Sequence, residues 1–394
     1  MAMRKGIFTI LATPAILTLS LPLHAQTESA GVQEKPRKTS RMMEEVVVTA
    51  QKREENANDV PISIQAFSPD QLAAFGIEDT TDLMRVTPGL DMGTQAGDFT
   101  SVFMRGIGSE AWLTSDPSVA TYIDGVYYPF SPSVAQSLKG VERVEILKGP
   151  QGTLFGRNAV GGAINVILKK PDFEDTWTEI SLATSRAEDR KTGEGSMFVN
   201  VPLTDSVAMN FAATYSYDTK VFTDDSTIAG EEIPADKLFA GRMMLRWEVN
   251  ENIDTRLTLQ GAKRDGTSTL AANIDTTPLG DVSGIDEEEG RNYRVNPDLP
   301  IFGHLQSFVV SSQTEVYLPW MDIKLLGSRQ AHSNPYNYDY DGTDFPGASF
   351  IVHRHEADIT EYEVQFLSNE GSLWSDWLTL TGGAFYFKNV QGFD

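Results

Sequence analysis

The part of the chain beyond Pro171 alternates apolar and polar positions with a period of two. From 207 to 217 the odd positions hold Val, Met, Phe, Ala and Tyr, whereas the even positions hold only small or polar residues. The stretches 239–249 and 361–366 repeat this alternation, with Arg or Glu among the polar positions. Such alternation predicts β-strands with one apolar face. A soluble sheet would bury that face in a core, whereas a transmembrane barrel turns it to lipid and keeps charges in its lumen.

The lengths of the connections favour the barrel over a soluble β-sandwich. We count about nine strands of roughly ten residues each, joined alternately by short and long links. We expect short turns near 203–205, 250–252, 319–320 and 370–375, and long links at 186–193, 218–236, 265–304 and 335–357. The tryptophans near the short turns, which would suit an interfacial aromatic girdle, are Trp247, Trp320, Trp374 and Trp377. Bacterial barrels close with an even number of strands, so we expect 171–394 to be a partial barrel whose C-terminal strands are missing.

The region 55–170 has a mixed pattern and is predicted to be a compact α/β unit. Alternation over 61–67 predicts a strand, and Ser68-Pro69-Asp70-Gln71 is a helix start with Ser as the N-cap. A second short helix is expected near 80–86, before Pro88. Asp124 and Gly125 lie between two strand-like stretches and predict a tight type I′ hairpin. Two further strands are expected at 144–148 and 163–168.

The N-terminus has the pattern of a secretory signal. Arg4 and Lys5 precede an apolar run to Leu23, and we expect cleavage after Ala25. A transmembrane anchor is the weaker alternative, because threonines and Pro14 interrupt a barely sufficient length. Residues 26–43 are expected to be a flexible leader. The segment 44–54 follows, with four β-branched residues in a row at 46–49.

Composition limits the possible functions. The chain has no Cys, and its net charge of -23 argues against nucleic-acid binding, which needs clustered Lys and Arg. The spacing of Gly106, Gly108 and Ala111 imitates a dinucleotide-binding turn, but no helix pattern follows it and no βαβ unit surrounds it. An enzyme is therefore a distant possibility.

Three motifs together carry a family resemblance. They are EEVVVTAQKRE at 44–54, DPSVATYIDGVYY at 116–128 and VERVEILKGPQGTLFGRNAVGGAINVI at 141–167. In this order they resemble the TonB box and the plug domain of TonB-dependent outer-membrane receptors. The resemblance implies an α+β plug domain at 55–170, followed by a truncated antiparallel transmembrane β-barrel. It also implies a bacterial outer-membrane location, with outer-membrane lipid around the barrel, and no catalytic group or cofactor.

The implied activity is energised import. TonB, powered from the inner membrane, would pull on the TonB box until the plug yields a path. The TonB-binding residues would be Glu45, Val46, Val47, Val48, Thr49 and Ala50. A run of β-branched residues suits strand addition to a partner's sheet edge, although an ordinary edge strand of the plug is the alternative. A surface binding protein without energy coupling is the competing functional class.

The resemblance also assigns plug-motif residues. These are Arg105, Gly106, Asp124, Gly125, Arg143, Glu145, Gly149, Gly152, Gly156, Gly161 and Gly162. Family arginines at the positions of Arg105 and Arg143 are thought to meet carboxylates on the barrel's inner wall. Inward-facing Glu361 and Glu363 are the candidate partners, and solvated plug-surface arginines are the alternative.

The cargo is the least specified feature. Ferric siderophores are the family's commonest substrates, and sugars, cobalamin or aromatic compounds are the alternatives. Tyr336, Tyr338 and Tyr340 lie in an expected long loop and could stack on a catecholate or a sugar. His353 and His355 would face the same way on a strand, but no third metal ligand is evident. Asn296-Pro297-Asp298-Leu299 resembles one box of haem receptors, but the companion Phe-Arg-Ala-Pro box is absent.

Overall fold

The fold is described from a computed structural model. It describes residues 47–49, 52–53, 55–56, 60–94, 99–109, 116–133, 138–187, 190–219, 223–224, 235–267, 294–295, 299–339, 349–369, 371–375 and 377–394. The expected signal at 1–25 and leader at 26–43 lie outside these residues, as do Glu45, Val46, Ala50 and Tyr340. The same holds for 296–298 of the haem-receptor-like box.

The N-terminal elements are short and mixed in type. They are β1 (Val47–Val48), β2 (Glu55–Asn56), β3 (Ile64–Phe67), α1 (Pro69–Ala74), the 3-10 helix η1 (Thr81–Arg85), β4 (Leu90–Thr94), β5 (Thr100–Met104), β6 (Ile107–Ser109), β7 (Val119–Ile123), β8 (Val126–Tyr127), the 3-10 helix η3 (Ser131–Ser133), β9 (Val141–Lys148), α2 (Gly152–Phe155) and β10 (Gly162–Leu168).

The C-terminal elements are nearly all long strands. They are β11 (Trp177–Ala187), β12 (Arg190–Thr204), β13 (Val207–Asp218), β14 (Thr223–Asp224), β15 (Asp236–Asn250), β16 (Ile253–Gly266), β17 (Arg294–Val295), β18 (Gly303–Leu318), β19 (Met321–Ser333), β20 (Tyr336–Asp339), β21 (Ser349–Val352), β22 (His355–Ser368) and β23 (Thr381–Phe393).

The mixed unit predicted for the N-terminal half is present. Its central sheet has the order β3-β9-β10-β7-β8, and a second sheet has the order β4-β5-β6. Ser68 caps α1 in a complete capping box with Gln71, as the sequence indicates. The second expected helix is the 3-10 helix η1. Gly106 lies in the turn between β5 and β6, so a hairpin and not a phosphate-binding helix follows it.

The predicted hairpin at Asp124 and Gly125 connects β7 and β8. Ile123 pairs with Val126, and both turn residues have positive φ angles, 49° for Asp124 and 83° for Gly125. These angles are the ones that a type I′ turn requires. The hairpin end therefore projects from the central sheet on a rigid two-residue turn.

The large sheet contains nine consecutive antiparallel strands among the described residues, in the order β11-β12-β13-β15-β16-β18-β19-β22-β23. On β13 the even positions 208–214 are buried, whereas the odd positions are more exposed, so the predicted alternation is correct. The strands have 11 to 16 residues and are longer than expected. The long link expected at 186–193 is wrong, because β11 continues to Ala187 and β12 begins at Arg190.

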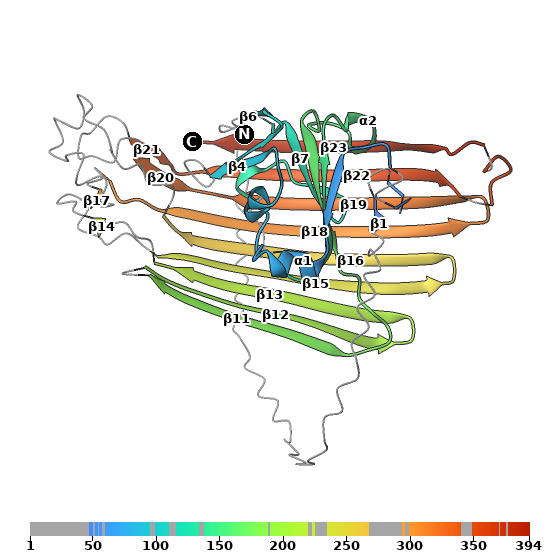
Figure 1. Ribbon diagram of the computed structural model, residues 1–394, viewed down its shortest axis with the longest axis horizontal. Helices are drawn as coiled ribbons and strands as arrows, with labels where there is room; N and C mark the ends of the chain where they lie inside the picture. The colour runs from blue at the N-terminus through green and yellow to red at the C-terminus, as the bar shows by residue number, and fades with distance from the viewer. Residues whose placement is uncertain are drawn as a thin grey trace, which may run out of the picture. The chain divides into compact units, whose positions relative to one another are not determined.

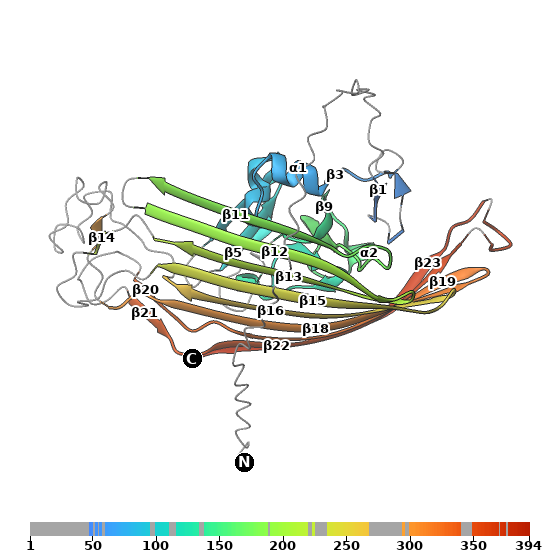
Figure 2. The same cartoon turned by 90° about the horizontal axis from the view of Figure 1, so that it is seen from below.

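The mixed unit lies against the concave face of the curved sheet (Figures 1 and 2). Its main apolar core is formed by α1, η1 and the strands of the mixed unit, and it includes Met244 of β15 and Val309 of β18. The outer face of the sheet exposes Tyr215, Phe239 and Phe308, each about half accessible. Among the described residues, no helix has the length and apolar character to cross a membrane.

Candidate functional site: the seam between the mixed unit and the sheet

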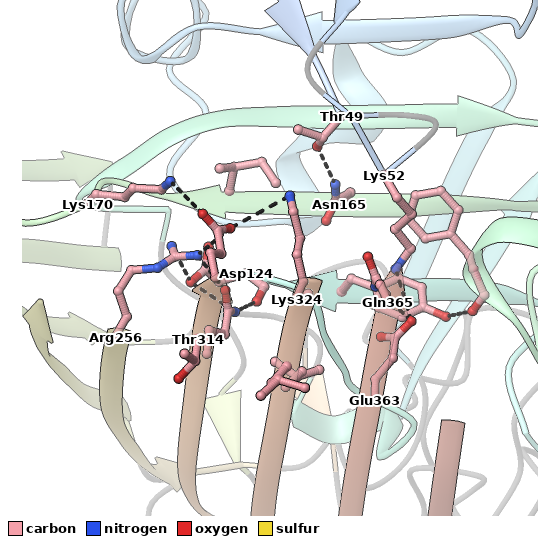
Figure 3. A pocket seen from close by; sticks show the side chains of 18 of the residues that line it. Thr49, Lys52, Asp124, Asn165, Lys170, Arg256, Thr314, Lys324, Glu363 and Gln365 are labelled. Carbon is pink, nitrogen blue, oxygen red and sulfur yellow. Dashed lines mark hydrogen bonds and ion pairs between the residues drawn. The ribbon is translucent and has the colours of Figure 1, made fainter. Parts of the chain in front are cut away.

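A cavity of about 140 Å³ lies where the mixed unit meets the sheet. Its lining comes from the segment around Thr49 and Lys52, from the hairpin end at Asp124 together with α2, β9 and β10, and from the inward side chains of β16, β18, β19 and β22. Figure 3 shows these side chains pointing toward one another from both sides of the cavity. We call this region the seam. It is the place where the N-terminal segment, the mixed unit and the sheet meet.

The N-terminal segment is held in the seam by a buried carboxylate. The Thr49 backbone N–H donates to Glu145 Oε1 at 2.8 Å, and the Thr49 hydroxyl donates to the same carboxylate at 3.0 Å. The Asn165 amide donates to Glu145 Oε2 at 3.1 Å and to Thr49 Oγ1 at 3.3 Å. Val48 is fully buried, but within the part of the chain that the structure describes β1 pairs only with the two-residue strand β2. The segment is therefore fixed by a few side-chain contacts and is no part of the central sheet.

Lys52 and Arg53 attach the same segment to the sheet. Lys52 Nζ lies 3.9 Å from Glu363 Oε1 of β22 and 4.9 Å from the Phe155 ring centroid. Burial lowers the pKa of Lys52 below its ordinary value, and the charge of Glu363 opposes this shift. The Arg53 guanidinium donates to the backbone oxygens of Ser368 and, at 2.6 Å, Leu380, which lie on either side of the β22–β23 connection.

The hairpin end is held by polar side chains of the sheet. Arg256 Nη1 of β16 lies 3.3 Å from Asp124 Oδ2, and the Gln313 amide of β18 donates to the Asp124 backbone oxygen. Both charged side chains are over 90% inaccessible, so water screens their attraction weakly. Arg256 also lies 3.6 Å from Glu315, which lies 3.7 Å from Lys324. We call Asp124, Arg256 and Gln313 the hairpin clamp.

The same face of the sheet holds the mixed unit at two further points. At Tyr127 the backbone N–H donates to Glu361 Oε2 at 3.2 Å, and the backbone oxygen accepts from Gln330 at 2.7 Å. Arg242 of β15 donates to the backbone oxygens of Lys139 at 2.7 Å and Gly140 at 2.9 Å. Sheet side chains thus hold backbone groups of the mixed unit at both points.

The pairing expected for Arg105 and Arg143 is wrong. Arg105 donates to Ser63 at 2.7 Å, and Arg143 lies 2.8 Å from Glu145, so both bind within the mixed unit. Glu361 and Glu363 face inward as expected, but they meet the Tyr127 backbone and Lys52. For Arg143 the reason is its position on β9. It lies two residues from Glu145 on the same strand face, so its guanidinium forms an ion pair with this neighbouring carboxylate. Arg143 consequently supports the carboxylate that holds Thr49.

The motif glycines occupy tight positions in the mixed unit. Gly106, Gly125, Gly149 and Gly156 have positive φ angles, and Gly152 begins α2. A Cβ on Gly161 would lie 2.8 Å from the Ile107 backbone oxygen, and one on Gly162 would lie 2.3 Å from that of Leu147. These glycines therefore allow β6, β9 and β10 to approach closely, which is a structural contribution to the unit that carries the seam.

The tyrosines expected in a long loop lie on a buried strand where the structure describes them. Tyr336 and Tyr338 are on β20, buried in a cluster with Phe99 of the mixed unit and Val352. His353 and His355 do not share a strand, because β21 ends at Val352 and β22 begins at His355. His355 is buried and stacks on Phe99 with ring centroids 5.1 Å apart. In the described part of the chain, no cluster of three His, Cys, Asp or Glu side chains could hold a metal.

Comparisons with known proteins identify the mixed unit. Residues 56–163 match the TonB-dependent Receptor Plug Domain family. The chain is 30% identical over 205 residues to the iron-regulated outer membrane virulence protein of Vibrio cholerae, covering 50% of this chain and 30% of that protein. It is 26% identical over 171 residues to the vitamin B12 transporter BtuB of Vibrio vulnificus, covering 42% of this chain and 25% of that protein.

A solved structure supports the same assignment of the fold. The ferric yersiniabactin uptake receptor FyuA from Yersinia pestis matches with a TM-score of 0.65 and 18% identity, covering 84% of this chain and 50% of that chain. The chain thus spans less than a third of the two sequence relatives and half of this receptor. It consists of a plug domain followed by a large antiparallel sheet of the kind found in outer-membrane receptors. Residues 56–163 are therefore similar to the plug domain of TonB-dependent receptors, and the chain as a whole is similar to outer-membrane receptors of this kind.

Proposed function

We propose that this protein takes part in TonB-dependent import of a ferric siderophore across the outer membrane. The observation that carries the proposal is the attachment of the 47–49 segment to the plug at the seam, through Glu145. Among the described residues, main-chain pairing there is limited to the two-residue strands β1 and β2. A partner that adds a strand to residues 45–50 could therefore remove the segment without breaking the plug's central sheet.

A pull on this segment would reach the plug and the sheet by different contacts. Thr49 passes the force to Glu145 in β9, whereas Lys52 and Arg53 pass it to β22 and its connection to β23. Separation of the plug from the sheet requires that the contacts of Lys52 and Arg53 break, as well as those that hold the hairpin end. Transport of this kind makes and breaks no covalent bond, so the proposal assigns no catalytic residue.

The proposed cargo rests on the relatives. The Vibrio cholerae protein is described as iron-regulated, and the Yersinia pestis structure is that of a ferric yersiniabactin uptake receptor. The relative described as a vitamin B12 transporter makes cobalamin the first alternative, with carbohydrates and aromatic compounds next. A surface binding protein without energy coupling is the alternative of a different class.

Val47→Pro tests the coupling step. Proline removes a backbone donor and restricts Val46, so a peptide spanning 43–55 with this change should lose binding to the periplasmic domain of TonB. In the receptor, transport should stop while ligand binding at the outer surface is retained. Val47→Ala, which keeps the backbone donor, is the matched control and should retain most of the transport. Normal transport by the proline variant would refute the assignment of residues 45–50.

Deletion of the gene under iron limitation tests the cargo. Uptake of at least one labelled ferric siderophore should fall, while labelled cobalamin uptake should not change. Complementation with the intact gene should restore the siderophore uptake. A cobalamin or glycan defect with unchanged iron uptake across a siderophore panel would replace the proposed cargo but leave the coupling proposal standing.

A further inference from the structure

Two lysines from different parts of the chain line the seam cavity. Lys52 belongs to the N-terminal segment, and Lys324 reaches into the cavity from β19 of the sheet (Figure 3). The carboxylates with which they pair, Glu363 and Glu315, are 3.9 Å and 3.7 Å away, which is beyond hydrogen-bonding distance. Among the described residues, neither ammonium group donates a hydrogen bond, and the positive charge of Lys324 acts unfavourably on that of Lys52. Both lysines therefore have donors left for a ligand in the cavity.

The lining of the cavity has an excess of positive charge. Its basic side chains are Lys52, Arg143, Lys170, Arg256 and Lys324, and its acidic side chains are Asp124, Glu315 and Glu363. Glu145, which is not part of the lining, neutralises Arg143. Glu315 is shared by three of the basic groups, at distances between 3.6 and 4.0 Å. Four basic groups thus face three carboxylates, so the charge of the lining favours an anion.

The cavity has the size and the polar groups that a small anion needs. A space of roughly 10–15 Å³ holds one water molecule, so the volume of about 140 Å³ is sufficient for several waters or for one tetrahedral oxyanion. Thr49, Asn165 and Gln365 add uncharged polar side chains to the lining. Gln365 is the cross-strand partner of Lys324 and donates to Glu363 Oε1 at 2.8 Å. A donor, an acceptor and a cation therefore lie next to one another on the sheet side of the cavity.

We propose that the seam binds inorganic hydrogen phosphate, held between the ammonium groups of Lys52 and Lys324. The anion would replace the repulsion of the two lysines with charge-assisted hydrogen bonds. Glu363 would provide selectivity, because an ionised carboxylate only accepts hydrogen bonds. It can accept from the P–OH group of hydrogen phosphate, but it repels sulfate, which carries no proton at neutral pH. Since Lys52 belongs to the segment and Lys324 to the sheet, bound phosphate would hold the segment docked, whatever cargo the protein imports.

The test uses the intact protein extracted from outer membranes and dialysed free of phosphate. Isothermal calorimetry measures its affinity for sodium phosphate, sodium sulfate and sodium chloride at neutral pH and constant ionic strength. Lys324→Gln removes one of the two ammonium groups, and Lys324→Arg retains the charge. Lys388→Gln is the matched control, because it makes the same charge change at an exposed lysine of β23. Glu363→Gln tests the selectivity, and far-UV circular dichroism with trypsin resistance establishes that each variant is folded.

We expect the unmodified protein to bind phosphate roughly tenfold more tightly than sulfate or chloride, a comparison that needs no variant. Lys324→Gln should weaken phosphate binding by roughly tenfold, because one charge-assisted donor is lost. Lys324→Arg and Lys388→Gln should retain most of the affinity. Glu363→Gln should reduce the preference for phosphate over sulfate, because the amide can donate to either anion.

A spin label at Gln51→Cys reports whether the anion holds the segment. Its mobile fraction should decrease as phosphate is added at constant ionic strength, and the decrease should be lost in Lys324→Gln. Equal affinities for phosphate and sulfate, or an unchanged phosphate affinity in the folded Lys324→Gln variant, would overturn the proposal. A mobile fraction that does not respond to bound phosphate would also overturn it, since the anion would then not connect the segment to the sheet.

Discussion

At the residue scale, Lys52 makes docking of the N-terminal segment depend on pH. Burial lowers its pKa from an ordinary value of 10.5, so the docked state prefers the neutral amine more than the released state does. Between the lowered pKa and 10.5, the released state binds more protons, and docking should become more favourable as pH rises.

A spin label can follow this equilibrium because the chain contains no native Cys. With Gln51→Cys labelled, the mobile fraction should decrease as pH rises through that window. Lys52→Met removes the ammonium group that lies over the Phe155 ring and cannot titrate, so its mobile fraction should not change over the same window. A pH response of equal size in the Met variant would assign the titration to another group.

Residue-scale features were predictable from sequence where the cause is local. The Ser68 capping box and the turn at Asp124 and Gly125 depend on neighbouring residues only, and both are correct. Choice of an ion-pair partner is different, because it depends on what packing brings close. Arg143 therefore pairs with Glu145 on its own strand. Arg256 belongs to no recognised motif and pairs with Asp124, which is 132 positions away in the sequence.

At the scale of elements, the hairpin clamp should hold β7 and β8 against the sheet. Asp124→Asn removes the nearer of the two carboxylates beside the buried Arg256 and should destabilise the docked hairpin by about 3 kcal/mol. Adding Arg256→Gln should recover part of this loss, since the buried charge that lost its nearer partner is then removed. Hydrogen exchange of the Ile123 and Val126 amides measures the effect.

Asp116→Asn is the matched control for the clamp. Its ion pair with Arg157 is also between a carboxylate and a guanidinium, but both side chains are substantially exposed. Removing it should cost less than about 1 kcal/mol. Equal effects of the two substitutions, or full additivity of Asp124→Asn and Arg256→Gln, would contradict the clamp.

The sequence predicted that the long strands exist and which side chains point inward or outward, but it did not predict where the strands end. Alternation reports which face meets lipid or lumen, and it determined the inward position of Arg242 correctly. Beyond the apolar band both faces are polar, so the pattern fades while pairing continues. For this reason β11 and β12 extend to Ala187 and Arg190, where a long link was expected, and β20 and β21 were missed.

At the scale of the whole molecule, the order of plug and sheet was predictable, whereas the contacts between them were not. The motifs define the plug, and the change of period after Pro171 marks the start of the sheet. The seam joins residues such as Arg53 and Ser368, which lie 315 positions apart. The local sequence pattern contains no signal for such pairs. The contacts that would control release of the segment could therefore be identified only from the structure.

Residues 55–170 expressed alone should form a soluble and ordered plug. The sheets β3-β9-β10-β7-β8 and β4-β5-β6 pair entirely within this range, and the large sheet contributes only Met244 and Val309 to the buried residues of the main core. Amides of β9 and β10 should therefore remain protected from exchange. The Tyr127 amide should lose protection, because its acceptor Glu361 belongs to the sheet. A random-coil circular dichroism spectrum would show that the plug needs the sheet to fold, and a protected Tyr127 amide would show that Glu361 is not what holds it.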